Sequence, residues 1–468
     1  MAELALAQLA VDPSSYVDPN GFVFAHGGEI LRAIRPEREA FYRGLLSDGS
    51  VGRLIKDHGL VETEISDYTI PEIACRLVLR HARVSPLSYC VEWCPSMLRD
   101  AARATLELAL ALLPRGCFLQ DAYPWNVLFS GTRPVFVDFT SIVPAETPLL
   151  WPAHQQFMDF FLNPLELCRM GKGKVARGLL YDPIEGINSA DVIAERTPGY
   201  VLRHPLRALG ERAAARLSAR IQKSSALKQR LQAASHSERF AVRDANLRER
   251  FFTRLLRRVE KIRIREAEDT WRDYYAGVTQ VTQSDEKARR VASLLEALRP
   301  DTVLDLGCNV GRYSVLAAQC GARVRSIDGS EHCIEALYRK AKTDGLDITP
   351  VVANALSPTP AFGFLGRQFP GLVERFRSDV VLCLGLMHHL HMNGRQSFER
   401  IAAMLRELAA RAVIFEYVAM DDDNIHLLDC GRPINYSLAS VSEALSRHFK
   451  LQTFESDRPT RRILVCEK

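Results

Sequence analysis

The sequence TVLDLGCNVG occupies residues 302–311, and RYSVLA follows it at residues 312–317. An apolar run that ends near an acid, Asp305, and then turns through two glycines into a helical pattern predicts a buried strand, a tight loop and a helix. Gly307 and Gly311 suit such a loop, because glycine adopts positive φ readily and lets a ligand approach the backbone. The spacing favours a loop that holds a nucleotide-like ligand. The alternative is the strand-to-helix turn of any α/β protein.

Three further apolar segments follow along the chain. They span residues 323–328, 347–354 and 378–385, and the first of them ends in an acid, Asp328. Helical patterns such as residues 331–337 lie between them, which predicts a parallel, doubly wound sheet with its ligand across the strand ends. A carboxylate at that edge can accept hydrogen bonds from both hydroxyls of a ribose.

With these segments in this order, residues from about 285 to 468 resemble a class I S-adenosylmethionine-dependent methyltransferase. The resemblance implies that the glycine loop holds the methionine part of the cofactor, S-adenosyl-L-methionine, and that the second strand holds its ribose. A polar residue after the third strand would lie beside the adenine. The cofactor-binding residues implied are Asp305, Gly307, Cys308, Asn309, Gly311, Asp328, Gly329, Asn354, Ala355 and Leu384.

Asn309 interrupts the Gly-x-Gly-x-x-Gly pattern of dinucleotide-binding loops, which disfavours a nicotinamide or flavin dehydrogenase. Residues 449–454 and 461–466 predict two last strands, as the antiparallel end of this family's sheet would require.

Methyl transfer from a sulfonium is an in-line displacement, so the protein must mainly align the nucleophile, the methyl carbon and the sulfur. We expect catalytic residues at His388 and His389, where this family presents its acceptor side, and at Glu416, which closes a fifth apolar strand. A base there would assist a hydroxyl or carboxyl acceptor. The alternative for each histidine is a hydrogen bond to the backbone. The acids at 421–423 suit a solvated loop better than a metal site, so we expect no metal.

The length of 468 residues predicts two domains and a connector, and a hydrophobic fraction of 47% with 25% charged residues is typical of a globular protein. Neither a basic leader nor an apolar run of membrane-spanning length is evident, so we expect a cytoplasmic protein. The cysteines form no Cys-x-x-Cys pairs, which favours free thiols and disfavours zinc.

Two β-like runs joined by a turn at residues 130–132 stand out in the first half of the chain. They would return Asp138 to the neighbourhood of Asp121 and Asn126. Two carboxylates and an amide in one place suit Mg²⁺ and phosphates.

This pattern resembles the catalytic loop and metal-binding acid of protein-kinase-like and aminoglycoside-phosphotransferase-like folds. In those folds the first acid orients the attacking hydroxyl, and the Asn and the second acid hold metal, which falls on Asp121, Asn126 and Asp138. A helix over 96–113 would precede the loop. A His-led triplet is missing, however, Thr140 replaces a glycine, and no clear Gly-rich loop precedes a strand lysine. We therefore expect a degenerate, non-catalytic kinase-like domain that shapes a substrate cleft. Turn and cap residues in an unrelated domain, or an active phosphotransferase, are the alternatives.

Residues 201–284 contain amphipathic helical patterns in which basic residues outnumber acidic ones. A solvated basic face on packed helices is favoured over a nucleic-acid site, because the net charge is only +5 and aromatic residues are not interleaved. The aromatic residues at 271–275 predict a lid or a wall of the acceptor pocket.

The predicted fold class is α/β: a Rossmann-like methyltransferase sheet over residues 285–468, preceded by an α+β kinase-like domain over 1–200 and a basic helical connector. This pairing is similar to that of a group of bacterial proteins that includes a nodulation protein. The leading functional hypothesis is methyl transfer from S-adenosylmethionine to oxygen of a small-molecule acceptor. A phosphotransferase with a cofactor-sensing second domain and a tRNA or other nucleic-acid methyltransferase are the alternatives. We expect no membrane partner, and the oligomeric state is left open.

Overall fold

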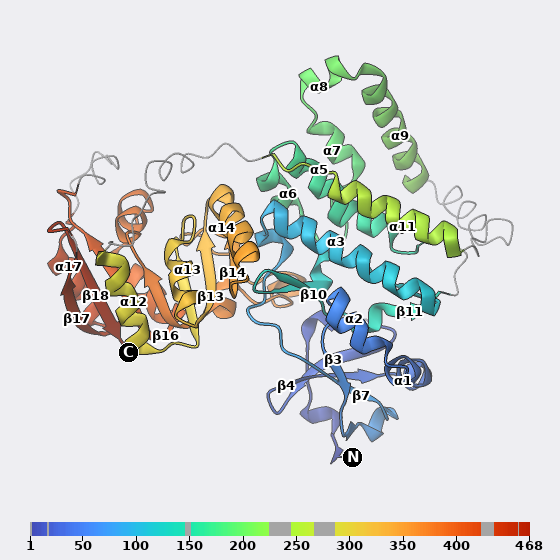
Figure 1. The fold of residues 1–468 in the computed structure, drawn as a ribbon, viewed down its shortest axis with the longest axis horizontal. Helices are drawn as coiled ribbons and strands as arrows, with labels where there is room; N and C mark the ends of the chain where they lie inside the picture. Colours follow the sequence, from blue (N-terminus) through green and yellow to red (C-terminus); the bar gives the residue numbers. More distant parts are fainter. Residues whose placement is uncertain are drawn as a thin grey trace.

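The computed structural model describes residues 2–15, 18–145, 151–223, 245–265, 286–422, 435–456 and 458–468. An N-terminal sheet lies at the bottom of Figure 1, helices lie above it, and a large C-terminal sheet lies at the left. In the part of the chain that the structure describes, no helix combines the length and the apolar character needed to span a membrane.

The C-terminal sheet has seven strands in the order β14-β13-β12-β15-β16-β18-β17. Neighbours from β14 to β16 are parallel, whereas β18 is antiparallel to both β16 and β17. The predicted doubly wound sheet with an antiparallel end is confirmed. Its strands are β12 (Thr302–Leu306), β13 (Arg323–Asp328), β14 (Ile348–Val352), β15 (Ser378–Cys383), β16 (Ala409–Val418), β17 (Lys450–Glu455) and β18 (Arg461–Glu467).

Helices cover both faces of this sheet, because successive side chains of a buried strand point to opposite faces. Val303 belongs to the apolar core under α12, α13 and α14, and Leu304 belongs to the core under α15, α16 and α17. The helices are α12 (Glu286–Leu298), α13 (Arg312–Gln319), α14 (Glu331–Asp344), α15 (Leu372–Phe376), α16 (Phe398–Leu408) and α17 (Leu438–Ser446).

The N-terminal sheet has five antiparallel strands in the order β2-β3-β4-β7-β5. Gly27 and Gly28 form the turn between β3 and β4 with φ of 57° and 83°, which glycine adopts at little cost. The strands and the helices beside them are β2 (Ala10–Val11), β3 (Gly21–His26), β4 (Glu29–Ile34), α1 (Glu39–Ser47), α2 (Ser50–His58), β5 (Thr63–Ile65) and β7 (Val78–His81), and a separate pair joins β1 (Ala2–Glu3) to β6 (Tyr68–Thr69).

A long buried helix, α3 (Pro95–Leu112), follows this sheet at the position predicted for the helix before the loop. Beyond α3, the predicted hairpin is confirmed by antiparallel pairing of β9 with β10. The remaining elements of this region are β8 (Cys117–Leu119), β9 (Val127–Ser130), β10 (Arg133–Phe136), β11 (Ile142–Pro144), α4 (His154–Phe157), α5 (Asn163–Arg169), α6 (Gly173–Leu179) and α7 (Ser189–Ala194).

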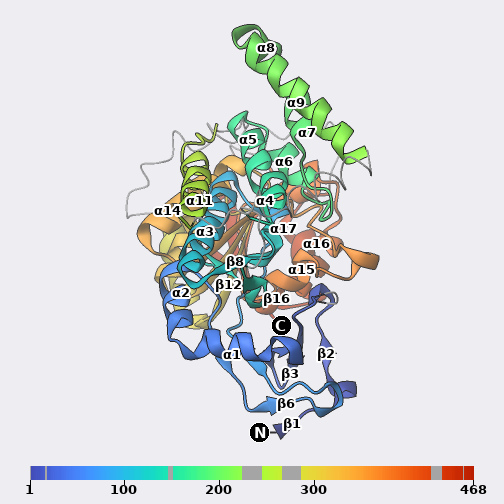
Figure 2. The ribbon, with the colours of Figure 1, turned by 90° about the vertical axis from the view of Figure 1, so that its right-hand side faces the viewer.

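The predicted connector contains three helices in the described residues: α8 (Pro198–Arg203), α9 (Pro205–Lys223) and α11 (Ala245–Glu260). Figures 1 and 2 show α8 and α9 extending away from the rest of the molecule. By contrast, α11 packs on α3, with Phe252 and Val259 buried while Arg254 and Arg257 are exposed. The aromatic residues predicted to form a lid, at 271–275, lie outside the described residues.

Candidate active site

The glycine loop joins β12 to α13. Gly307 and Gly311 have φ of 74° and 81°, as the sequence predicts. A Cβ on Gly311 would lie 2.2 Å from Cδ1 of Leu337, and a Cβ on Gly307 would lie 2.9 Å from Cδ1 of Leu386. The space left at Gly311 is therefore filled by a side chain of α14, and its glycine is needed for packing as well as for φ.

Asp328 ends β13 beside this loop. Its Oδ2 accepts a hydrogen bond from the backbone N–H of Asn309 at 2.8 Å, and its Oδ1 accepts one from the N–H of Ser330 at 2.8 Å. Ser330 in turn caps α14, because its Oγ accepts a hydrogen bond from the N–H of Cys333. The Asp328 carboxylate thus links the glycine loop to the start of α14.

Asp305 lies one strand away and is almost fully buried. Its Oδ2 accepts a hydrogen bond from Ser314 Oγ at 2.6 Å, and Ser326 donates in turn to Ser314. Burial raises the pKa of Asp305 to about 6, and the hydrogen bond from Ser314 opposes that rise. Asp305 therefore holds the helix after the loop against the strand.

A cavity of about 540 Å³ lies at the carboxyl ends of β12, β13, β15 and β16. Its volume is within the range of small-molecule sites. All the residues predicted to bind the cofactor line it except Gly311: Asp305, Gly307, Cys308, Asn309, Asp328, Gly329, Asn354, Ala355 and Leu384. The folded chain thus brings nine of the ten predicted residues to one cavity.

The predicted catalytic residues His388, His389 and Glu416 line the same cavity. The two imidazole ring centroids are 4.3 Å apart. Burial, with the nearby His389 and Arg461, lowers the pKa of His388 to about 3, and burial also lowers the pKa of His389. Nδ1 of His388 is buried and has no hydrogen-bond partner among the described residues. At neutral pH His388 is therefore an uncharged group that can accept a hydrogen bond from a ligand.

Glu416 is fully buried at the end of β16 and lies between two cations. Lys287 Nζ, on α12, donates to Glu416 Oε2 at 2.6 Å, and Arg461 Nη1, at the start of β18, is 3.6 Å from Glu416 Oε1. Both cations line the cavity, and sequence reasoning missed both. Only the antiparallel register, which places Arg461 opposite Val418, brings this arginine to the end of β16.

The expectation of a solvated loop at residues 421–423 is wrong for Asp422. This side chain is buried and accepts hydrogen bonds from Arg461 Nε at 2.8 Å and Nη2 at 3.0 Å, and from Thr460 Oγ1 at 2.8 Å. A buried carboxylate needs such a charged partner, which local sequence does not reveal. Asp423 lies outside the described residues.

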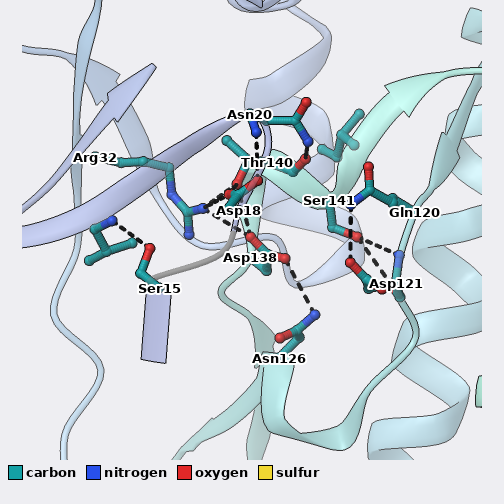
Figure 3. Close-up of polar contacts among 12 residues, drawn as sticks. Ser15, Asp18, Asn20, Arg32, Gln120, Asp121, Asn126, Asp138, Thr140 and Ser141 are labelled. Carbon is teal, nitrogen blue, oxygen red and sulfur yellow. Dashed lines mark hydrogen bonds and ion pairs between the residues drawn. The ribbon is translucent and has the colours of Figure 1, made fainter. Parts of the chain in front are cut away.

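A second polar cluster, shown in Figure 3, lies around residues 121–138, which we call the kinase-like loop after the sequence prediction. Asn126 Nδ2 donates to Asp138 Oδ2 at 3.4 Å, so the structure brings these two predicted residues together. Arg32 Nη1, from β4, donates to Asp138 Oδ1 at 3.0 Å and to Asp18 Oδ2 at 3.2 Å. Thr140 Oγ1 lies within hydrogen-bonding distance of both carboxylates and can donate to one of them at a time. A protein cation therefore neutralises the acid that would hold a metal in a kinase.

Asp121 has partners other than Asn126 and Asp138. Its Oδ1 accepts a hydrogen bond from Gln156 Nε2 at 3.2 Å, its Oδ2 accepts one from Gln120 Nε2 at 3.3 Å, and its backbone N–H donates to Ser141 Oγ. Sequence reasoning missed Arg32, although a lone cation in the apolar strand β4 was a signal for it. Among the described residues, no group of three His, Cys, Asp or Glu side chains is placed to hold a metal ion.

Comparison with known proteins gives matches for both parts of the chain. Residues 303–407 match the family described as a methyltransferase domain. The nodulation protein NoeA of Rhizobium meliloti (strain 1021) is 27% identical over 460 residues, which cover 96% of this chain and 94% of that protein.

Solved structures also match part of the chain. Magnesium protoporphyrin IX methyltransferase (ChlM) from Synechocystis PCC 6803 with bound SAH is 23% identical, covers 42% of this chain and 97% of its own, and has a TM-score of 0.30. The bifunctional kinase-methyltransferase WbdD is 19% identical, covers 43% of this chain and 40% of its own, and has a TM-score of 0.27.

Proposed function

We propose that this S-adenosylmethionine-dependent methyltransferase, in which residues 303–407 match a methyltransferase domain, methylates oxygen of a small-molecule acceptor. One observation carries the proposal. The cavity at the strand ends presents two buried acceptor atoms, Nδ1 of His388 and Oε1 of Glu416, and neither has a hydrogen-bond partner among the described residues. A hydroxyl group can donate to such atoms.

The proposed cofactor position is the part of the cavity lined by the glycine loop, Asp328 and Asn354. Gly329 leaves open space beside Asp328, since a Cβ there would meet nothing within 4 Å. We propose that Asp328 binds the ribose, that Asn354 and Ala355 lie beside the adenine, and that the loop 307–310 holds the methionine part. S-adenosylmethionine, when bound, supplies a methyl group on a sulfonium that an oxygen nucleophile can displace in line.

The residues of this chain then act on the acceptor. His388 is uncharged at neutral pH and accepts a hydrogen bond from the reacting hydroxyl, which directs an oxygen lone pair to the methyl carbon. An imidazole whose pKa is about 3 takes up a full proton less readily than an ordinary histidine, so its contribution is chiefly orientation. Glu416, fixed by Lys287, offers a second acceptor atom, Oε1, to the same ligand, and this carboxylate receives the proton that the hydroxyl loses as its oxygen bonds to the methyl carbon.

The decisive experiment uses small-molecule and macromolecular fractions of a cell extract. The full chain is incubated with each fraction and with S-adenosylmethionine that carries a labelled methyl group. We expect label in one small molecule, stable to base as an ether is and detected by mass spectrometry. Label that enters RNA or protein instead would refute the small-molecule acceptor, and base-labile label would indicate a methyl ester.

Once the acceptor has been identified, variants of the two histidines test whether these residues position it. Replacing both His388 and His389 by alanine is expected to lower turnover by about 10- to 100-fold, because each contributes to positioning the acceptor. The affinity for S-adenosylhomocysteine should change far less. The variant His448→Ala, far along the chain in the loop after α17, is the control. An unchanged turnover in the double variant would remove both histidines from the acceptor site.

A further inference from the structure

Helix α14 carries a polar stripe toward the N-terminal domain. Glu331, Glu335, Tyr338 and Lys342 are spaced by four, three and four residues, so they share one face of the helix. Glu335 and Tyr338 are 4% and 1% exposed, respectively. These side chains would face water if the methyltransferase domain stood alone, and instead they contact helices of the other domain.

The partners of this stripe lie on α3 and on α6, where Arg177 donates to Glu331. The backbone N–H of Ser96, in the first turn of α3, donates to Glu335 Oε2 at 3.0 Å, and its Oγ donates to Oε1. Asp100, one turn further along α3, accepts hydrogen bonds from Tyr338 Oη at 2.7 Å and from Lys342 Nζ at 2.6 Å. A carboxylate at the start of a helix also interacts favourably with the helix dipole, which strengthens the contact of Glu335.

The same helix supports the cofactor cavity from its other side. Its first residues follow Asp328 directly, and the N–H of Ser330 fixes the Asp328 carboxylate. Leu337 fills the notch at Gly311 in the glycine loop. A shift of α14 would therefore move both the proposed ribose carboxylate and the loop beside it.

The N-terminal domain also holds the segment between β14 and β15, which begins with the cavity residues Asn354 and Ala355. Arg375 is 1% exposed at its side chain and forms a double hydrogen bond with fully buried Glu92, at 2.5 Å and 3.0 Å. Phe369 stacks on Trp125, with ring centroids 4.8 Å apart. Trp125 directly precedes Asn126 of the kinase-like loop.

We propose that the N-terminal domain positions part of the methyltransferase site. By holding α14 and residues 354–376 in place, this domain sets the affinity for the adenosine half of the cofactor. The inference rests on the proposed function only in its assignment of the adenosine side of the cavity. Both segments that the N-terminal domain holds are the ones that follow the strands β13 and β14, where ribose and adenine are proposed to bind.

The test changes α3, which does not line the cavity. We expect Ser96→Ala combined with Asp100→Ala to weaken binding of S-adenosylhomocysteine to the full chain by about 2- to 30-fold, the range of energetic couplings between such sites. Adenosine alone should lose affinity by a similar factor, because its contacts lie on the supported side. Calorimetry at a temperature well below the thermal unfolding of each variant measures both affinities.

Two variants serve as controls. Arg103→Ala removes an exposed intrahelical ion pair from α3, and Lys340→Ala removes one from α14. Both should bind S-adenosylhomocysteine as the unaltered chain does. Asp100→Asn keeps an acceptor for Tyr338 and should retain most of the affinity for S-adenosylhomocysteine. A higher affinity in this variant than in the alanine variant would show that the lost contact, and not a general loss of stability, weakens binding.

If the double variant fails to fold, Tyr338→Phe, which removes one hydroxyl, carries the test with the same expected direction. Unchanged affinity in folded variants would overturn the inference while leaving the proposed function intact. Failure of the unaltered chain to bind S-adenosylhomocysteine would instead refute the cofactor assignment itself.

Discussion

Asp305 and Asp328 lie on neighbouring strands of the sheet, yet their surroundings differ. Asp305 is buried and bonded to Ser314, and burial raises its pKa to about 6. Asp328 accepts hydrogen bonds from backbone N–H groups on both sides and lines the cavity. The first is therefore suited to holding the loop, and the second is suited to binding a ligand.

Replacing Asp328 by alanine is expected to weaken the binding of S-adenosylhomocysteine by about 1.5–3 kcal/mol, the contribution of a charge-assisted hydrogen bond. That corresponds to about a 10- to 150-fold rise in the calorimetric Kd. Asp344→Ala, an exposed acid at the end of α14, is the control. An unchanged Kd in the Asp328 variant would exclude this residue from the cofactor site.

Asp305→Asn should change how stability depends on pH. The folded chain raises the pKa of Asp305 to about 6, above the value of about 3.9 in the unfolded chain. Between these values the folded state binds more protons, so Asp305 costs stability as pH rises from about 4 to 6. Asparagine does not titrate. We therefore expect the variant to gain up to about 3 kcal/mol relative to the unaltered chain between pH 4 and 7.

Urea denaturation at a series of pH values measures this difference. Asn can still accept the hydrogen bond of Ser314, so the packing is retained. A difference in the free energy of unfolding that stays constant with pH would contradict the raised pKa.

At the scale of elements, Glu416 joins α12, β16 and β18. Lys287 and Arg461 reach its carboxylate from two different elements, and Asp422 balances the second cation. Buried ions of this kind are stable only when each has its partner, because desolvation costs several kcal/mol per ion. The geometry of the proposed acceptor site thus depends on how α12 and β18 pack against β16.

Removing one member of the Lys287–Glu416 pair should therefore lower the free energy of unfolding more than removing both members. Lys287→Met is expected to destabilise the fold by about 2–4 kcal/mol, since among the described residues Glu416 then keeps only the longer contact to Arg461. Lys287→Met combined with Glu416→Gln should recover part of that loss. Thermal and urea unfolding of the single and double variants measure the coupling. Additive losses would show that the pair contributes nothing beyond its separate side chains.

At the scale of the whole molecule, the two domains share one apolar core. A continuous cluster of buried residues runs from α3, through Phe129 of the hairpin, to Tyr338 and Ile334 of α14 and on to the sheet. The rings of Phe129 and Tyr338 are 6.1 Å apart. The N-terminal domain thus contributes packing to the methyltransferase domain, which agrees with a supporting role in place of a second catalytic one.

We accordingly expect the full chain to show no Mg²⁺-dependent binding of ATP. Arg32 already pairs with Asp138, and the carboxylate of Asp18 adds a negative charge where phosphates would approach. Calorimetric titration with ATP and Mg²⁺ measures this directly. Binding that is lost in Asp138→Asn and kept in Asp57→Asn, an exposed control, would establish a working nucleotide site and refute this expectation.

Much of the C-terminal fold could be predicted because its signals are local. Apolar runs closing on Asp305 and Asp328 mark strands whose ends meet at one edge, and a parallel sheet brings consecutive strand ends together. Glycine at 307 and 311 indicates positive φ by itself. The same reasoning placed nine of the ten predicted cofactor residues and all three predicted catalytic residues at one cavity.

The amino-acid sequence by itself determined the periodic strands and helices, the glycine loop and the hairpin of the first domain, because these follow from side-chain pattern and backbone preference within a few residues. Only the tertiary structure decided the partners of charged groups. Arg461 meets Glu416 and Asp422 through strand register, Arg32 of β4 meets Asp138 in the segment after β10, and Glu335 meets Ser96 across two domains. The last of these pairs joins residues 239 positions apart, and burial, which makes such partners necessary, exists only once the chain has folded.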